Sequence, residues 1–370
     1  MRNLRLMLPL SFINMLFFPI VGWLFYFLQY LNYQQIAQIM GIGVIFSLVM
    51  EIPTGVFADM VGRKWAVFLS YVFFTIAMVG TMLSTTYLTF LIVTLLNSLV
   101  NSLYSGSMEA LLYDTLKQEK RETEFDVWTS RMDAISWIGL FVSSVVGGYM
   151  YSVNPKLPYL AQTVATAIGA IIVLWLVEPK LDSIKYKMGD IWKNNLLGFK
   201  ELFRNAKLRY LTSIFVVIGL GYYIASDILG LSQLRQYGLE ASLAGWVFGV
   251  GFVISATMAH FYPTLRKKLG EMRLVWISTT ALLISFVFAR FVGVATGVGL
   301  VMLRIASSTT FRNSRSVIMN REIASRNRAT TLSTLNLLQM LPYGLSAGLI
   351  GGYIDRTSPN QMAWVMGIVM

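Results

Sequence analysis

Polar side chains recur at a regular interval inside a long apolar segment near residue 100. Asn97, Asn101, Ser105 and Glu109 follow one another four residues apart. That interval places side chains on one face of an α-helix, so the four would form a single polar stripe. Amides, a hydroxyl and a carboxylate can bind a polar molecule or carry a proton, and a face in contact only with lipid would not hold them. We therefore expect the stripe to face a neighbouring helix or a water-filled cavity.

Two isolated charges, Asp227 and Arg304, also interrupt apolar segments. A charge inside such a segment is costly, so we treat each as a functional candidate that pairs with the other or meets a charged substrate or a proton. Trp23, Tyr104 and Tyr222 are candidates to line the same cavity. Their rings would favour lipophilic or cationic molecules through stacking and cation–π contact.

Composition excludes several other kinds of chemistry. The 370 residues include no cysteine and one histidine, His260, which excludes disulfides and thiolate sites and argues against a histidine-based metal site. No G-x-x-x-x-G-K-[ST] loop occurs, so ATP is not the direct energy source. A polytopic membrane enzyme would need clustered histidines, cysteines or paired carboxylates, and it stays a remote alternative. We expect no enzymatic activity, no cofactor and no metal.

The elements that carry these residues are membrane spans. Hydrophobic residues make up 56% of the chain and charged residues 13%, against about 25% charged in a soluble domain. Apolar stretches of about 20 residues, each long enough to cross a bilayer, recur along the whole length. The expected spans are roughly 5–28, 35–61, 64–84, 87–115, 126–150, 158–178, 208–232, 241–264, 272–291, 294–318, 328–353 and an incomplete one from about 361. The sequence predicts an all-α polytopic membrane protein.

Basic residues set the expected orientation. The formal net charge is +12, and most of the 30 lysines and arginines lie in clusters between alternate pairs of spans. The positive-inside rule places these clusters in the cytoplasm, together with the N-terminus. Because the clusters follow the spans, we expect the chain to contact a lipid bilayer and not nucleic acid.

A long polar segment and a short repeat divide the chain. The segment 180–207 is polar, with six spans before it (1–179) and nearly six after it (208–370). "GGYMYSVNP" (147–155) ends span five, and "GGYIDRTSP" (351–359) ends span eleven. Two parallel six-helix halves joined by a cytoplasmic linker are typical of a transporter with its site between the halves. We expect a monomer, because this arrangement is self-sufficient.

The last segment is too short to cross a membrane. "QMAWVMGIVM" gives ten residues, or about 15 Å of helix, where about 30 Å of hydrocarbon must be crossed. A chain end at mid-membrane would leave polar groups unsatisfied. We therefore expect the given sequence to stop within a longer twelfth span.

The turn between spans two and three carries a recognisable motif. "GVFADMVGRK" (55–64) resembles the pattern Gly-x-Leu-Ala-Asp-Arg-x-Gly-Arg-Lys of the major facilitator superfamily, a family of transporters. Matching positions of the proposed gating motif are Gly55, Asp59, Gly62, Arg63 and Lys64. "EIPTG" (51–55) and "SGSMEALLYD" (105–114) are similar to a bacterial drug-efflux-like branch of that superfamily. Glycines in the motif would allow close helix approach and a sharp turn.

The resemblance implies roles for the charged residues. Asp59 would dock on the N-terminus of span eleven, where free N–H groups and the helix dipole favour an anion. Arg63 would join a cytoplasmic charge relay with Asp114, and we place Glu109 and Arg131 with the same gate. The superfamily fold would have twelve transmembrane helices, with spans one, four, seven and ten lining the cavity.

The function that follows is secondary active transport by alternating access. The leading hypothesis is proton-coupled efflux of a small amphipathic or drug-like molecule across the bacterial cytoplasmic membrane. Two departures from efflux relatives keep a proton-coupled importer of a small polar nutrient open. Span four has no arginine in "LLNSLVNS", and Ser143 and Ser144 replace a Gly-Pro pair in span five. A passive channel or a scaffold is a further alternative.

Overall fold

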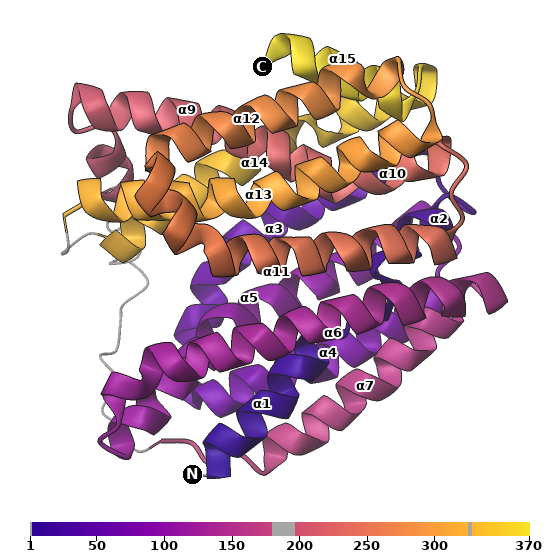
Figure 1. Ribbon diagram of the computed structural model, residues 1–370. Coiled ribbons are helices and arrows are strands. Elements are labelled where there is room, and N and C mark those ends of the chain that lie inside the picture. The colour runs from indigo at the N-terminus through magenta and orange to yellow at the C-terminus, as the bar shows by residue number, and fades with distance from the viewer. Residues whose placement is uncertain (1, 180–196, 325–327) are drawn as a thin grey trace. The chain divides into compact units, whose positions relative to one another are not determined.

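The structure is a computed structural model that describes residues 2–179, 197–324 and 328–370. Over these residues it is built from helices and turns, without a strand (Figure 1). Eleven helical segments of the described chain are long and apolar enough to cross a membrane. The protein is therefore a multi-pass membrane protein with an all-α fold.

The chain forms two compact units. Unit 1 comprises residues 1–31 and 42–191, and unit 2 comprises residues 32–41 and 192–370. The helix α3 (Tyr33–Val61) runs across this division, so that its first nine residues belong to unit 2 and the others to unit 1. The polar segment predicted as a linker, 180–207, lies partly outside the described residues.

Unit 1 holds most of the N-terminal spans. Its elements are α1 (Arg2–Met15), η1 (Phe18–Ile20), α2 (Trp23–Phe27), the rest of α3, α4 (Arg63–Leu83), α5 (Tyr87–Gln118), η2 (Glu122–Glu124), α6 (Phe125–Val153) and α7 (Leu157–Leu174). Apolar side chains of these helices pack around Tyr71 of α4, which is 1% exposed. The Tyr71 hydroxyl donates to Leu10 O at 2.8 Å, and Gly169 leaves the space that the Tyr71 ring fills. This core ties α4 to α1 and α7.

The first span is not the single helix expected over 5–28. The 3-10 turn η1 separates α1 from α2. Pro19 lies in this turn and has no N–H to donate, which accounts for a break at this point. The chain also passes close to α6 here: a Cβ on Gly147 would collide with Phe18 O, and one on Gly22 would lie 2.7 Å from Tyr151 Cδ2.

Unit 2 holds the remaining spans. Besides residues 32–41 and a short helix at 197–202, its elements are α9 (Ala206–Ile224), η3 (Ala225–Leu229), α10 (Gly230–Gln236), α11 (Ala241–Leu269), α12 (Glu271–Val287), η4 (Phe288–Arg290), α13 (Val294–Glu322), α14 (Arg328–Arg356) and α15 (Pro359–Val369). The backbone at η3 makes a π-type turn, so α9, η3 and α10 form one span with a local bulge.

A buried amide joins three helices inside unit 2. Gln339 of α14 is 6% exposed, and its Nε2 donates to Phe215 O of α9 at 2.6 Å. Its Oε1 accepts a hydrogen bond from Arg315 of α13. A Cβ on Gly219 would collide with the Gln339 side chain, so this glycine makes room for the amide. Both polar atoms of this amide are thus satisfied inside the bundle, as an apolar surrounding requires.

Candidate functional site

The turn after α3 is built on Gly62, whose φ of +115° favours glycine. The turn sends the chain directly into α4, and its first residue, Arg63, forms an ion pair with Asp114 of α5. Both side chains are about one-fifth exposed. The structure thus brings together two of the residues that the family resemblance assigned to a charge relay.

A second carboxylate, missed by the sequence analysis, holds the same turn. Glu178 follows α7, and its Oε1 accepts from Arg63 N at 2.8 Å while its Oε2 accepts from Lys64 N at 2.7 Å. These are two of the amides that a helix start leaves without an intrahelical partner. A Cβ on Gly62 would lie 3.0 Å from the Glu178 carboxylate. Glycine at this position therefore serves both the turn and the approach of Glu178.

Other residues of the motif have simpler surroundings. Lys64 Nζ donates to Leu174 O at 2.9 Å, which ties the turn to the end of α7. Gly55 lies within α3, and a Cβ there would meet no described atom within 4 Å, so the close helix approach expected at this glycine is absent from the described structure. Asp59 is half-buried. Its docking on span eleven joins residues of different units and stays a prediction.

The polar stripe of α5 is accessible. Asn97 is half-buried, Asn101 and Glu109 are exposed, and the side chain of Ser105 lies outside the described residues. The helix contact on this part of α5 is made instead by a flanking residue, Ser102, which donates to Ser47 O of α3 at 3.1 Å. No described helix covers Asn101 or Glu109, and the water-filled cavity that the stripe would line stays a prediction.

The remaining candidates of unit 1 are held by aromatic packing. Tyr104 lies edge-on to Tyr71, with ring centroids 6.0 Å apart, and packs against the core. Trp23 begins α2 and lies edge-on to Phe27. The Arg131 guanidinium lies 5.1 Å from the ring centroid of Trp128. Tyr104 is thus part of the interior of unit 1, whereas Arg131 is exposed and able to pair elsewhere.

The seventh span of the chain, which lies in unit 2, contains a carboxylate. Asp227 lies in the π-type turn η3 and accepts a hydrogen bond from Tyr343 of α14, whose side chain is fully buried. Tyr343 in turn packs on Tyr223, with ring centroids 5.1 Å apart. Pro342 precedes Tyr343 within α14 and removes one backbone hydrogen bond there. The π-type turn of one span and the residue after the proline of another therefore meet at the carboxylate.

Arg304 has neutral partners and does not pair with Asp227. It is 3% exposed, its Nη2 donates to Gln233 Oε1 at 2.8 Å, and its guanidinium lies 5.3 Å from the ring centroid of Phe286. Gln233 donates to Asn360 Oδ1 at 3.1 Å, which extends the network to α15. Arg304 thus holds α10, α12, α13 and α15 together inside unit 2.

Tyr222, the last cavity candidate, also points into this bundle. Its hydroxyl donates to Ser278 O at 2.7 Å and lies 2.9 Å from Ser307 Oγ. The side chain is 7% exposed and stacks on Phe311. Tyr222 and Arg304 are therefore buried inside unit 2, whereas Asp227 is half-buried, and the role of all three in a substrate cavity stays a prediction.

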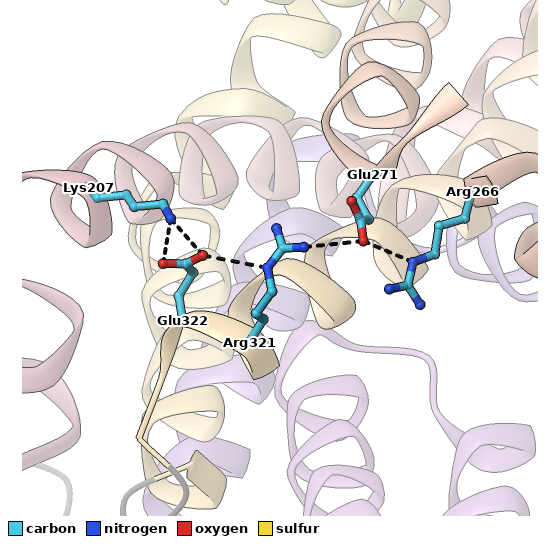
Figure 2. Close-up of polar contacts among 5 residues, drawn as sticks. All are labelled: Lys207, Arg266, Glu271, Arg321 and Glu322. Atoms are coloured by element: carbon cyan, nitrogen blue, oxygen red, sulfur yellow. Dashed lines mark hydrogen bonds and ion pairs between the residues drawn. The ribbon is translucent and has the colours of Figure 1, made fainter. Parts of the chain in front are cut away.

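One end of unit 2 carries a chain of alternating charges that the sequence analysis counted only as basic clusters (Figure 2). The ion pairs run from Lys207 to Glu322 (2.7 Å), to Arg321 (3.6 Å), to Glu271 (3.5 Å) and to Arg266 (2.9 Å). The two carboxylates are 17% and 18% exposed, and the three cations are far more exposed. The chain links α9, α13, α12 and α11 at their ends. A single exposed ion pair contributes little to the free energy of folding, but several linked pairs can hold these four helix ends together.

Comparison with known proteins identifies the family. A family model described as Major Facilitator Superfamily matches residues 7–347. The chain belongs to the major facilitator superfamily. Members of this superfamily are membrane transporters, so membrane transport is the activity class of the chain. The drug-efflux branch is a finer assignment that this match does not make.

Curated relatives of the superfamily are distant. An uncharacterised MFS-type transporter of Methanocaldococcus jannaschii is 21% identical over 36% of this chain, and the match spans about a third (32%) of that relative. The uncharacterised MFS-type transporter YxaM of Bacillus subtilis is 22% identical over 74% of this chain and 69% of its own length. Both carry the superfamily name without a substrate.

Solved structures share the superfamily fold. The nucleoside transporter NupG has a TM-score of 0.80 at 15% identity, and the match covers 98% of this chain and 96% of that one. A POT family transporter in complex with 5-aminolevulinic acid has a TM-score of 0.73 at 10% identity, and the match covers 100% and 93%. At these identities the likeness concerns the fold alone.

Proposed function

We propose that the chain is a proton-coupled secondary transporter that moves a small polar or amphipathic molecule by alternating access. Its charged helix ends, which carry Arg63, Lys64 and the network of Figure 2, would face the cytoplasm of a bacterial cell. The protein would alternate between an inward-open and an outward-open state, as transporters built from paired helical repeats do.

Asp227 is the observation that carries this proposal. Of the carboxylates on the described spans of unit 2, it alone lies well inside a span, about two and a half turns from the span end at Gln236. Its partner is the hydroxyl of Tyr343 and not a cation. A carboxylate free of a bound cation can accept a proton from one side of the membrane and release it to the other. The π-type turn that carries Asp227 is a geometry frequent at functional sites.

The direction of transport has two candidates. Export of an amphipathic molecule follows from the efflux-like motifs in spans two and four. Import of a polar nutrient is favoured by a specific observation, namely the accessible amides of Asn97 and Asn101, which have no hydrogen-bond partner among the described residues. The nucleoside and peptide transporters with the same fold carry polar molecules by their names, which supports this second candidate.

Proton coupling can be tested with the Asp227→Asn variant. Purified protein in liposomes that contain a pH dye would be challenged with nucleosides, dipeptides and lipophilic cations under an imposed pH gradient. We expect at least one compound to evoke a proton flux with the wild type. Asp227→Asn should reduce this flux at least tenfold while substrate exchange at equal pH persists, because the amide cannot carry the proton. Glu240→Gln, an exposed change outside the spans, is the matched control.

A flux that is equal in Asp227→Asn and wild type would overturn the role of Asp227. The direction is then measured in intact cells by accumulation of the active compound, with and without an uncoupler. Lower accumulation in cells that contain the protein, reversed by the uncoupler, identifies export. Higher accumulation that collapses with the uncoupler identifies import.

A further inference from the structure

The start of α3 is held by a carboxylate from the far end of α14. Asp355 Oδ1 accepts from Tyr33 N at 3.0 Å, and Asp355 Oδ2 accepts from Gln34 N at 2.8 Å. Asn32 Oδ1 accepts from the next amide, Gln35 N, at 2.9 Å. The orphan donors of this helix start are therefore satisfied, and the two supplied by Asp355 are bonds to a charged acceptor, which are stronger than neutral ones. Asp355 and residues 32–41 both belong to unit 2.

Small residues bring α14 and the start of α3 into backbone contact. A Cβ on Gly351 would collide with Tyr33 O, and one on Gly348 would lie 2.7 Å from Gln38 Cγ. One turn further, a Cβ on Gly41 would lie 2.6 Å from Gly344 O. Glycines at 344, 348 and 351 follow the three- and four-residue spacing of one helix face, which allows close packing in a membrane. Ala37 and Ala347, in the same seam, are both fully buried.

The amides that Asp355 binds lie at an exposed surface beside a cavity. A cavity of about 540 Å³ adjoins the carboxylate and is lined mainly by polar residues, among them Arg235, Gln236 and Thr357. If Asp355 withdrew, water could replace it at the two amides, so separation would leave no buried donor without a partner. The long side chains over the seam glycines are those of Gln34 and Gln38, which are polar and can be hydrated when the two helices separate. Both features allow this contact to form and break at moderate cost.

The contact acts on a helix with its two ends in different units. α3 is continuous from Tyr33 to Val61, and its first nine residues lie in unit 2 and the rest in unit 1. Its other end leads into the Gly62 turn, which the carboxylates of Glu178 and Asp114 hold within unit 1. Any movement of one unit against the other must therefore bend α3 or release one end. Of the two ends, the one at Asp355 borders the cavity.

We propose that Asp355 and the glycine face of α14 form a releasable clasp on the start of α3, which holds the transporter closed at the end opposite the charge network. Opening at this end separates α3 from α14 and transfers the amides of Tyr33 and Gln34 to water. The clasp rests on the proposed function, because only a protein that alternates between two states needs to release it.

The absence of cysteine in the chain makes the test direct. A single reporter, Ala37→Cys, is placed at a position with 0% exposure in the seam. Its labelling by a membrane-impermeant maleimide is timed in intact and in permeabilised cells, so that either membrane orientation is covered. Asp355→Asn should raise the labelling rate about tenfold, the population change expected for loss of charge-assisted bonds at the helix start. Arg356→Gln, one residue further and exposed, should leave the rate unchanged.

Equal labelling in the wild-type, Asp355→Asn and Arg356→Gln backgrounds would overturn the clasp. Ala347→Cys, also fully buried, reports from the α14 side and replaces the first reporter if that variant does not fold. In a second arm, oxidation of the pair Gln38→Cys and Gly348→Cys should form a disulfide that stops flux until it is reduced. Labelling needs no substrate, so its failure is distinct from failure of the proposed function: faster labelling without any proton flux would keep the clasp and reject proton coupling.

Discussion

The GGY sequence occurs at residues 147–149 in unit 1 and at residues 351–353 in unit 2, and the two copies make different contacts. In unit 1, Gly147 lets α6 approach the backbone of Phe18, and four residues later the Tyr151 ring covers Gly22. In unit 2, the matching Gly351 lets α14 approach the backbone of Tyr33, and four residues later stands Asp355. The glycine has the same physical role in both copies. The fifth residue of the repeat differs between the copies. In unit 1 the Tyr151 ring packs on Gly22, and in unit 2 the Asp355 carboxylate accepts hydrogen bonds from the first amides of α3.

This difference indicates which helix contact is permanent and which can be released. A tyrosine ring that fills a glycine's space loses its packing as soon as it moves, and the surrounding apolar atoms have nothing to replace it. A carboxylate on exposed amides can be replaced by water at small net cost. We therefore expect the unit 1 copy to contribute to stability and the unit 2 copy to set a conformational equilibrium.

The largest expected effect comes from Gly147→Ala. Its Cβ would collide with the carbonyl group of Phe18, and both partners are backbone, so no rotamer change relieves the clash. We expect a loss of about 3 kcal/mol in the free energy of unfolding, at the upper end of overpacking effects. The check is thermal unfolding in detergent, followed by the fluorescence of the nine tryptophans.

Gly352→Ala is the control for this change, because its Cβ would meet only the flexible Gln34 side chain at 3.3 Å. It should unfold within a few degrees of the wild type. If Gly147→Ala were as stable as Gly352→Ala, then α6 and η1 would be able to separate, and the distinction between a fixed and a releasable copy would be lost.

An intermediate effect is expected for Glu178→Gln. Like Asp355, Glu178 caps two consecutive amides of a helix start, but it lies in unit 1 beside the Arg63–Asp114 pair. The amide keeps one acceptor and loses the charge, which should lower stability by about 1 kcal/mol. Thermal unfolding should show this loss, and the labelling of Ala37→Cys should not change, since α3 is held at its other end.

Glu122→Gln, an exposed change on the same side of unit 1, supplies the baseline for Glu178→Gln. Faster labelling of Ala37→Cys in Glu178→Gln would contradict the comparison. It would mean that the two ends of α3 are coupled, so that release at the Gly62 turn also opens the clasp.

The spans could be predicted from the sequence because lipid imposes a length and a composition on every crossing helix. The break in the first span had a signal in Pro19, which an apolar average over 5–28 conceals. The π-type turn at Asp227 has no comparable signal, because its residues would also suit an α-helix. Its position follows from packing within unit 2.

Some contacts of the site residues could likewise be predicted from the sequence, and others could not. The pairing of Arg63 with Asp114 came from family resemblance, and no local spacing indicates it. Glu178 is 115 residues from Arg63 and Asp355 is 322 residues from Tyr33, so neither cap could be inferred from neighbours in the chain. Arg304 was expected to pair with Asp227 or to meet a charged substrate or a proton; its side-chain partner is the neutral amide of Gln233, and a role with substrate or proton stays a prediction. Such contacts are decided by which helix ends meet, which requires the fold.

The smallest effect on stability is expected for Tyr151→Phe. This change removes the hydroxyl of Tyr151 and keeps its ring, so it tests the hydrogen bond of the unit 1 copy separately from its packing. The Tyr151 hydroxyl accepts from Gln29 Nε2 at 3.0 Å in an exposed setting, whereas its ring covers Gly22. Phenylalanine keeps the ring, so we expect a loss of about 0.5 kcal/mol or less and an unfolding temperature close to that of Tyr210→Phe, an exposed control. If Tyr151→Phe instead approached Gly147→Ala in its effect, the hydroxyl and not the ring would hold α6 to the first span. The unit 1 copy would then be a polar contact like that of Asp355, and it too would be a candidate for release during transport.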